Sequence, residues 1–306
     1  MMEMCGVTPN VTYVLHDSWW LQPHIFHIIM PTKRKEVMDM ITLKNVQKSY
    51  GTHKVLKDVN LNIRQGEIYG LIGKNGAGKT TIFKMILGLT EFEHGEISIA
   101  GSRNKSDLLQ ARKKIGFFIG KNFFDYLDAR NNLDYYRVMK GIKDKKEIDR
   151  VLELVGLQDA KGQFGGFSMG MKQRLGIAGA MLGKPEILLL DEPVNGLDPH
   201  GIADIRNMML HLNKEYGTTI IVSSHILGEL EHTANRFGII DGGRVLKEIT
   251  HEDLKTKNNT IELSVDDYQK AKRVLAENHI RVLKESSEYK TLEDYYFEVV
   301  GGAIND

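Results

Sequence analysis

Stretches of alternating apolar and polar residues open the patterned part of the chain. Residues 41–44 read Ile-Thr-Leu-Lys and residues 59–64 read Val-Asn-Leu-Asn-Ile-Arg. A period of two is typical of a strand with one buried face, so we expect a half-buried antiparallel sheet here. The segment 93–101 alternates in the same way beside glycines and indicates a further strand.

Continuous apolar runs later in the chain predict buried parallel strands. Residues 187–190 are Ile-Leu-Leu-Leu, residues 218–222 are Thr-Thr-Ile-Ile-Val, and a helical pattern at 201–215 separates them. This order is typical of a βαβ unit in which both faces of the sheet are covered. The run 67–72 has the same character and leads into a helix-prone stretch at 81–89.

A helical period dominates the middle of the chain. We expect helices at 129–140, 145–155 and 171–182. In the second of these, apolar residues recur at steps of three and four and form one face, namely Ile148, Val151, Leu152 and Val155.

The two ends of the chain follow other patterns. Residues 1–39 show neither a helical nor an alternating pattern and are rich in Met, His and Trp, so we expect a poorly ordered extension. Alternatively, translation begins at Met38 or Met40, and the earlier residues are upstream sequence. A strand–helix–strand rhythm with its helix at 267–278 predicts a small α+β accessory unit over 249–306. The main domain is then expected at 40–248.

Composition narrows the class of protein. The 306 residues are 42% hydrophobic and 26% charged, with 41 Lys and Arg against 40 Asp and Glu. The net charge of +1 gives no sign of a nucleic-acid partner. Cys5 is the single cysteine, which excludes an intrachain disulfide and favours a reducing compartment. No apolar run approaches the roughly 18 residues that span a bilayer. A function in the membrane would therefore require a transmembrane part supplied by another chain.

Residues 73–80, Gly-Lys-Asn-Gly-Ala-Gly-Lys-Thr, join the apolar run to the helix-prone stretch. This is the P-loop spacing, in which glycines turn backbone N–H groups toward phosphate and the helix adds its positive end. Lys79 would reach the β- and γ-phosphates, and Thr80 would ligate Mg²⁺. An ordinary glycine-rich turn is the alternative. The candidate nucleotide-binding residues are Gly73, Lys74, Asn75, Gly76, Ala77, Gly78, Lys79, Thr80 and Thr81.

Two acids follow the buried strand at 187–190. In a P-loop ATPase, such a pair places the first acid near Mg²⁺ and the second beside the attacking water. Asp191 is therefore a candidate metal ligand with Thr80, and Glu192 a candidate for orienting or deprotonating water. The alternative is a plain strand end followed by an acidic helix cap.

Further segments occur in a characteristic order: Tyr50-Gly51, Phe167-Ser168-Met169-Gly170-Met171-Lys172-Gln173-Arg174, Asn195-Gly196-Leu197-Asp198 and Ser223-Ser224-His225. With them, the chain resembles the ATP-binding subunit of an ABC transporter over about residues 41–248. The resemblance implies an α/β P-loop NTPase core, an antiparallel β subdomain and a helical subdomain near 121–178.

The resemblance also implies roles for individual residues. Tyr50 would stack on adenine, although it could instead be a packing residue at a strand end. Ser168 and Gly170 would contact the γ-phosphate bound to a second subunit, consistent with Ser168 as a helix N-cap. Asp198 would lie in the D-loop. His225 would contact the γ-phosphate and join Glu192 and Lys79 as a catalytic residue; a surface or capping histidine is the alternative.

Two departures from the common pattern are informative. Met169 and Met171 replace a glycine and a glutamine of the signature, a version similar to exporters of peptide antibiotics such as bacitracin and lantibiotics. The segment 292–301 resembles the C-terminal end of that subfamily. Gly120 stands where the family has Gln or Glu, a side chain that normally touches Mg²⁺ and water; Asn122 is a candidate replacement.

These observations predict a subunit that binds and hydrolyses ATP with Mg²⁺ and powers a membrane exporter. Two ATP molecules would lie in a head-to-tail dimer, homomeric or heteromeric, docked on a membrane permease near residues 117–126. The chain would be cytoplasmic and would meet the membrane through that permease. The alternatives are a soluble ABC ATPase acting on ribosomes or DNA, which the single P-loop argues against, and a regulatory ATPase with weak hydrolysis. The substrate does not follow from the sequence.

Overall fold

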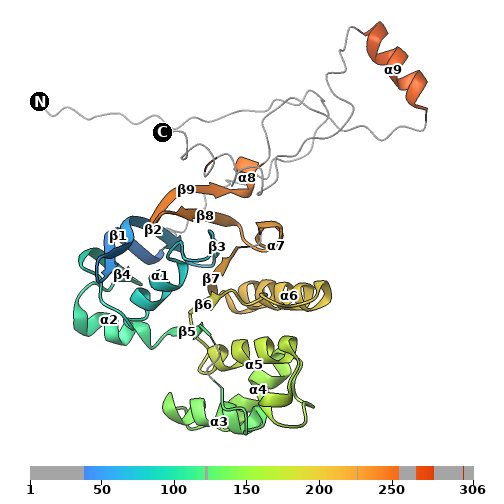
Figure 1. Ribbon diagram of the computed structural model, residues 1–306. Coiled ribbons are helices and arrows are strands. Elements are labelled where there is room, and N and C mark those ends of the chain that lie inside the picture. Colours follow the sequence, from blue (N-terminus) through green and yellow to red (C-terminus); the bar gives the residue numbers. More distant parts are fainter. Residues whose placement is uncertain (1–37, 121–122, 226, 255–266, 279–298, 300–306) are drawn as a thin grey trace, which may run out of the picture. The chain divides into compact units, whose positions relative to one another are not determined.

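The computed structural model describes residues 38–120, 123–225, 227–254, 267–278 and 299, and its strands form two sheets (Figure 1). The strands are β1 Asp39–Tyr50, β2 His53–Arg64, β3 Ile68–Ile72, β4 His94–Ile99, β5 Ile115–Phe118, β6 Ile187–Asp191, β7 Thr219–Ser224, β8 Arg236–Asp241 and β9 Arg244–Thr250. The helices are α1 Lys79–Ile86, α2 Lys105–Arg112, α3 Ala129–Met139, α4 Lys146–Leu154, η1 Phe164–Gly166 (a 3₁₀ turn), α5 Met169–Met181, α6 Pro199–Tyr216, α7 Leu227–Glu231, α8 His251–Leu254 and α9 Tyr268–Glu277.

The smaller sheet is antiparallel, in the order β2-β1-β4. Leu43 pairs with Leu61 on one side and with Ile97 on the other, and all three side chains are buried. The predicted half-buried antiparallel sheet is confirmed, because the alternation places one face of each strand in the core.

The larger sheet has the order β5-β6-β7-β3-β8-β9 and is parallel except for β9. The predicted parallel pairing of the two apolar runs is confirmed, since β6 and β7 are neighbours. Strand β3, which leads into the P-loop, lies between β7 and β8. The carboxyl ends of β3, β6 and β7 therefore meet at one edge of the sheet, the usual place for ligands in open α/β sheets.

The core lies on both faces of the larger sheet. One face, with Ile68, Leu188 and Ile220, packs in a cluster with residues of α3 to α6. The other face, with Tyr69 and Leu189, packs in a cluster with the antiparallel sheet, α1 and α2. Alternate residues of a strand point to opposite faces, so short apolar runs serve both layers.

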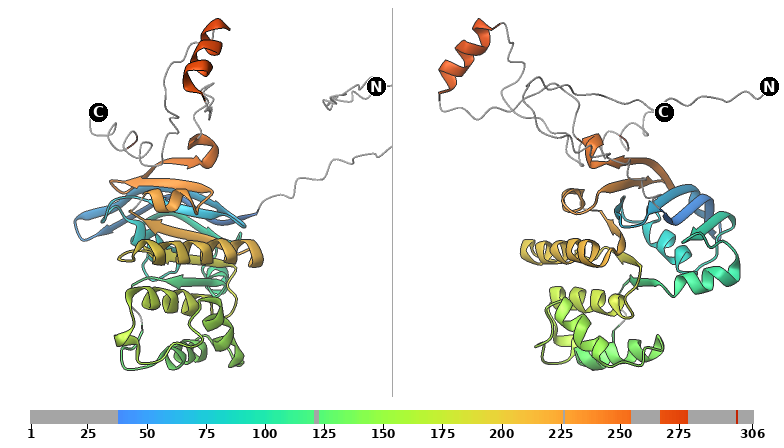
Figure 2. Two further views of the ribbon diagram at one scale, coloured as in Figure 1. Left: turned by 90° about the vertical axis from the view of Figure 1, so that its right-hand side faces the viewer. Right: turned by 180° about the vertical axis from the view of Figure 1, so that it is seen from behind.

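The three helices predicted in the middle of the chain are confirmed as α3, α4 and α5. Both views in Figure 2 show them grouped together, apart from the antiparallel sheet. The predicted helix at 267–278 is confirmed as α9. Residues 1–37 of the expected extension and the strands expected before and after the helix at 267–278 lie outside the described residues. The predicted domain boundaries stay a prediction.

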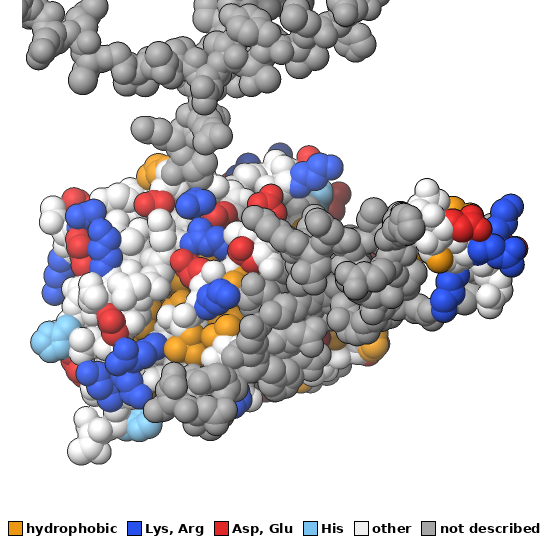
Figure 3. Space-filling view, turned by 90° about the horizontal axis from the view of Figure 1, so that it is seen from above, with side chains coloured by type: hydrophobic (Ala, Val, Ile, Leu, Met, Phe, Trp, Pro, Cys, Tyr) orange, Lys and Arg blue, Asp and Glu red, His pale blue; other side chains and the backbone are white. Residues whose placement is uncertain are grey.

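The surface of the described residues carries both signs of charge. Figure 3 shows basic and acidic side chains interspersed on the visible part of one face, in keeping with the net charge of +1. Within the described ranges, none of the helices has the length and apolar character that crossing a membrane requires.

Candidate functional site

The loop between β3 and α1 has a backbone that requires glycine at defined positions. A Cβ atom on Gly73 would lie 2.3 Å from the Ile240 carbonyl oxygen. A Cβ on Gly78 would lie 2.4 Å from Leu56, and Gly78 has a φ of 111°. No side chain caps the start of α1, so its N-terminal N–H groups remain available to an anion.

Lys79 holds a buried charge at the base of this loop. Its side chain is 5% exposed, and Nζ donates to the carbonyl oxygens of Gly73 (2.6 Å) and Lys74 (3.1 Å). Nζ also lies 3.3 Å from Glu192 Oε1. A buried ammonium needs such partners, and phosphate oxygens are stronger acceptors that could replace them.

Asp191 is fixed by two hydroxyl groups. Thr80 Oγ1 donates to Asp191 Oδ2 at 2.6 Å, and Ser223 Oγ donates to Asp191 Oδ1 at 2.6 Å. The hydroxyl and carboxylate oxygens are hard donors of the kind that Mg²⁺ prefers. The described residues contain no cluster of three His, Cys, Asp or Glu side chains that would enclose a metal. The Thr80 hydroxyl and the Asp191 carboxylate fit Mg²⁺, an ion that takes few carboxylate ligands in proteins.

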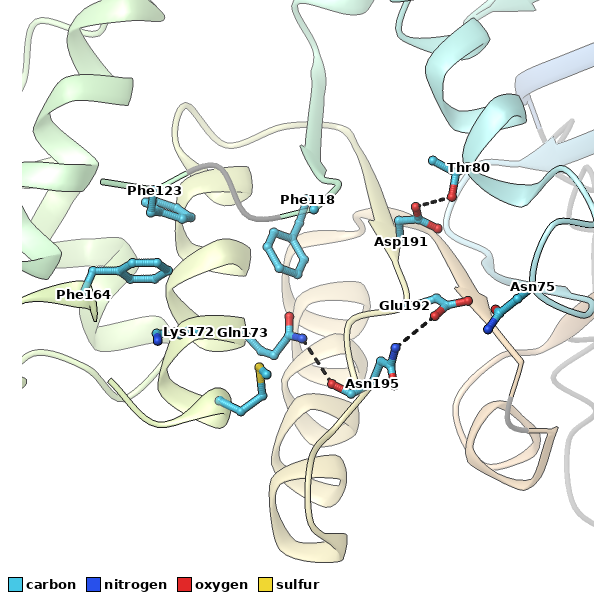
Figure 4. A pocket seen from close by; sticks show the side chains of 12 residues that line it. Asn75, Thr80, Phe118, Phe123, Phe164, Lys172, Gln173, Asp191, Glu192 and Asn195 are labelled. Atoms are coloured by element: carbon cyan, nitrogen blue, oxygen red, sulfur yellow. Dashed lines mark hydrogen bonds between the residues drawn. The ribbon is translucent and has the colours of Figure 1, made fainter. Parts of the chain in front are cut away.

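Glu192 lies at the centre of a polar cluster (Figure 4). Oε1 is 3.3 Å from His225 Nδ1, and Oε2 accepts a 3.2 Å hydrogen bond from Asn195 Nδ2. The backbone of Glu192 has a φ of 49°, a left-handed conformation that non-glycine residues rarely adopt and that often marks functional sites. Ser223 Oγ supports it by accepting from Glu192 N at 3.0 Å. Close to His225, burial raises the pKa of the Glu229 carboxyl, and His225 opposes this shift.

Two cavities adjoin this cluster. One, of about 340 Å³, is lined by the P-loop and also by His53 and Val55 of β2, which sequence reasoning did not single out. The other, of about 470 Å³, has Asp191 and Glu192 on one side and three phenylalanines on the other (Figure 4). Its aromatic lining is Phe118, Phe123 and Phe164. Together they can admit a polar, phosphate-bearing ligand beside an apolar wall.

Tyr50 lies at the end of β1 with 48% of its surface exposed. The Lys48 ammonium lies 5.1 Å from the centre of its ring. Glu93 accepts hydrogen bonds from Ser49 N (2.8 Å) and Ser49 Oγ (3.0 Å), and these bonds lower the pKa of the Glu93 carboxyl. Glu93 therefore fixes the backbone at Ser49, next to Tyr50, while the Tyr50 ring remains accessible for stacking.

Ser168 and Asp198 act as helix caps. Ser168 Oγ accepts from Met171 N at 3.2 Å at the start of α5, and Asp198 Oδ1 accepts from Gly201 N at 2.9 Å at the start of α6. The P-loop, Asp191, Glu192 and His225 are brought together in one cluster. Ser168, Gly170 and Asp198 are not among the residues that line the two cavities.

Comparison with known proteins identifies the family. The model of the ABC transporter family matches residues 56–195. The bacitracin transport ATP-binding protein BcrA of Bacillus licheniformis is 39% identical over 86% of this chain and 98% of its own length. The chain belongs to the ABC transporter family. The lantibiotic transport ATP-binding protein SrtF of Streptococcus pyogenes is 41% identical over 68% of this chain and 90% of its own.

Structural similarity agrees with this assignment. A dimeric structure of a bacterial ABC transporter cassette has a TM-score of 0.63 at 30% identity, covering 69% of this chain and 99% of the cassette. The resemblance stated from the sequence and the P-loop fold are confirmed. The chain is an ATP-binding, ATP-hydrolysing subunit that powers a membrane ABC transporter, and the soluble alternative is not supported.

Gly120, expected from the sequence to stand where this family has Gln or Glu, lines the larger cavity together with Asp191 and Glu192. Its equivalence to that position stays a prediction. Its φ is 70°, and a Cβ there would meet nothing within 4 Å. The space would admit a longer side chain, but the left-handed backbone favours glycine. Asn122, the candidate replacement, lies outside the described residues.

Proposed function

We propose that this chain supplies the energy for an exporter of antibiotic-like peptides or drugs. The observation that carries the proposal is the cluster of Lys79, Asp191, Glu192 and His225 at the carboxyl edge of the sheet. The similarity to bacitracin and lantibiotic transport proteins supports the proposed substrate class. Their similarity extends over most of their own length, which favours a shared role.

The proposed binding step follows from the present partners of the P-loop. Backbone N–H groups of residues 73–81 bind the phosphates, and Lys79 exchanges its carbonyl partners and Glu192 for phosphate oxygens. Thr80 and Asp191 hold Mg²⁺, which when bound neutralises charge on the phosphates. The exposed ring of Tyr50 stacks on the adenine base.

Hydrolysis would depend on Glu192 as the group that orients and deprotonates water. Once Lys79 turns to the phosphates, the Glu192 carboxylate loses a cationic partner and becomes available to water. His225, 3.3 Å from Glu192, would contact the γ-phosphate; its proximity to Glu192 supports this role.

Glu192→Gln tests this role. The amide keeps the shape but cannot accept the proton, so we expect retained ATP binding, a roughly 10²- to 10⁴-fold fall in turnover and accumulation of an ATP-bound dimer. Steady-state hydrolysis, nucleotide binding and size-exclusion chromatography measure these three. Glu186→Gln, at an exposed pair with Lys114, is the matched control and should behave as wild type. Wild-type turnover in Glu192→Gln would remove Glu192 as the base.

A second ATP-binding subunit would complete each site. Ser168 and Gly170, at the start of α5, do not line the cavities of their own chain, and a Cβ on Gly170 would meet only Leu197, at 3.8 Å. We expect the N-terminal end of this helix to face the γ-phosphate held by the partner subunit. The D-loop residue Asp198 would lie at the same interface. The dimeric cassette similar to this chain supports such an assembly.

A membrane permease is the proposed second partner, and the chain would lie at the cytoplasmic face of the membrane. Purification of the native protein from detergent-solubilised membranes tests this arrangement. A polytopic permease should co-purify with it, whereas ribosomes in its place would overturn the transport role.

A further inference from the structure

The Glu192 carboxylate is held on both of its oxygens by different groups. Oε1 lies 3.3 Å from Lys79 Nζ and 3.3 Å from His225 Nδ1, while Oε2 accepts from Asn195 Nδ2 at 3.2 Å. Figure 4 shows the bond from Asn195 to Glu192. Because Lys79 lies beside the other carboxylate oxygen, this bond would persist when Lys79 turns to phosphate.

Asn195 also restrains the backbone of Glu192. With a φ of 49°, Glu192 sits in a conformation that the surrounding structure must impose. Asn195 closes the turn that follows, because Asn195 N donates to Glu192 O at 3.2 Å. The side chain of Asn195 therefore restrains the Glu192 carboxylate, and its backbone restrains the Glu192 carbonyl.

Asn195 is itself tied to helix α5. Gln173 Nε2 donates to Asn195 O at 3.5 Å. The other polar atom of this amide, Gln173 Oε1, is buried and without a hydrogen-bond partner among the described residues. The adjoining turn also approaches α5, where a Cβ on Gly196 would lie 3.9 Å from Met169 Cγ.

We propose that Asn195 is a positioning residue for Glu192, and that Gln173 anchors Asn195 to α5. The inference rests on the proposed role of Glu192 as the base. Helix α5 begins after Ser168, about one turn before Gln173, so the direction of the carboxylate is linked to the helix proposed to contact the partner's nucleotide. Neither Asn195 nor Gln173 need touch the nucleotide for this effect.

Two measurements on the full-length chain test the proposal: kcat for ATP hydrolysis, which should fall in the variants, and the ATP dissociation constant, which should not change. Asn195→Asp keeps the size of the side chain but loses the donor, and Asn195→Ala loses the side chain altogether. Both should lower kcat by roughly ten- to a hundredfold, the range for a lost hydrogen bond to a charged group, with the ATP dissociation constant and melting temperature near wild type. Gln173→Glu removes the Nε2 donor and should lower kcat less.

Two controls make the outcome decisive. Asn207→Asp introduces the same charge change at an exposed position of α6 and should leave kcat unchanged. Asn195→Ala added to Glu192→Gln should cause no further loss, because both act through one carboxylate. Wild-type kcat in both Asn195 variants beside an inactive Glu192→Gln would overturn the positioning role alone. Parallel losses of kcat, ATP affinity and melting temperature would also overturn it in favour of a structural role, whereas turnover by Glu192→Gln would overturn the proposed function.

Discussion

At the scale of single residues, one hydroxyl organises both acids of the site. Ser223 Oγ donates to Asp191 Oδ1 at 2.6 Å and accepts from Glu192 N at 3.0 Å. Ser223 is fully buried, so water cannot substitute for either bond. The orientation of the proposed metal ligand and of the proposed base therefore depends on the same side chain.

Removal of this hydroxyl should affect stability and turnover together. Ser223→Ala leaves a partly buried carboxylate oxygen without its donor, which costs about 1–3 kcal/mol of folding free energy. We expect a lower melting temperature. Misorientation of the two acids should also slow hydrolysis about tenfold, which corresponds to about 1.4 kcal/mol of activation free energy. Thermal unfolding and steady-state hydrolysis measure the two effects. Ser106→Ala, whose hydroxyl is exposed, is the control, and an unchanged Ser223→Ala would show that the acids are held by other groups.

The site could be predicted only in part from the sequence. The P-loop and the two acids were found because their spacing along the chain is itself the signal. Ser223 and Asn195 were not recognised as partners of the acids, since their contacts depend on tertiary structure. Asp191 meets Ser223 only because β6 and β7 pair in parallel with these two residues in register. Spacing within one chain segment does not contain that information.

At the scale of elements, the strands and helices that were predicted are those with strong periodicity. Strands β1 and β2 alternate cleanly, and α4 carries a continuous apolar face. Strand β5 was not predicted, because Ile-Gly-Phe-Phe is short and interrupted by glycine. Strand β9 is largely exposed and shows little alternation, so only its pairing with β8 defines it.

Helix α5 approaches β5 closely at a glycine. A Cβ on Gly176 would lie 2.2 Å from the Phe118 ring, which also lines the larger cavity. Gly176→Ala would normally favour a helix by about 0.8–1 kcal/mol. Here we expect a net destabilisation of about 1–3 kcal/mol from overpacking, measured by denaturant unfolding. Gly228→Ala in α7 has open space around it and should be neutral or stabilising; a stabilised Gly176→Ala would instead show that Phe118 moves freely.

At the scale of the whole molecule, exposed apolar side chains gather on α3. Tyr135, Val138 and Met139 follow at steps of three and four, and the last two are 60% and 70% exposed. Tyr126 is also exposed, and its ring contacts Phe124, which in turn contacts Tyr135 at 5.0 Å between ring centres. Contiguous apolar surface of this kind marks a site for another protein.

Of the described residues in the segment 117–126 expected to dock the permease, only Phe124 and Tyr126 contact or extend this surface, and another part of the segment packs inward. Phe118 and Phe123 pack against the core, and Phe123 contacts Tyr136 and Phe164. Asn132, fully buried, bonds to both the N–H and the carbonyl of Phe124 and so holds the loop in place. The proposed docking surface therefore adjoins a packed and hydrogen-bonded part of the helical region.

Charge on this surface should separate transport coupling from catalysis. The double variant Val138→Asp/Met139→Asp places two carboxylates on the exposed face of α3, so an apolar partner would have to desolvate them on binding. We expect the permease to be lost from the detergent-purified complex while hydrolysis by the isolated chain stays near wild type, because neither residue lines the nucleotide cavities. Leu210→Asp, at an exposed apolar position of α6, should keep the permease bound. Co-purification of the permease with the double variant at wild-type yield would place its docking site elsewhere on the molecule.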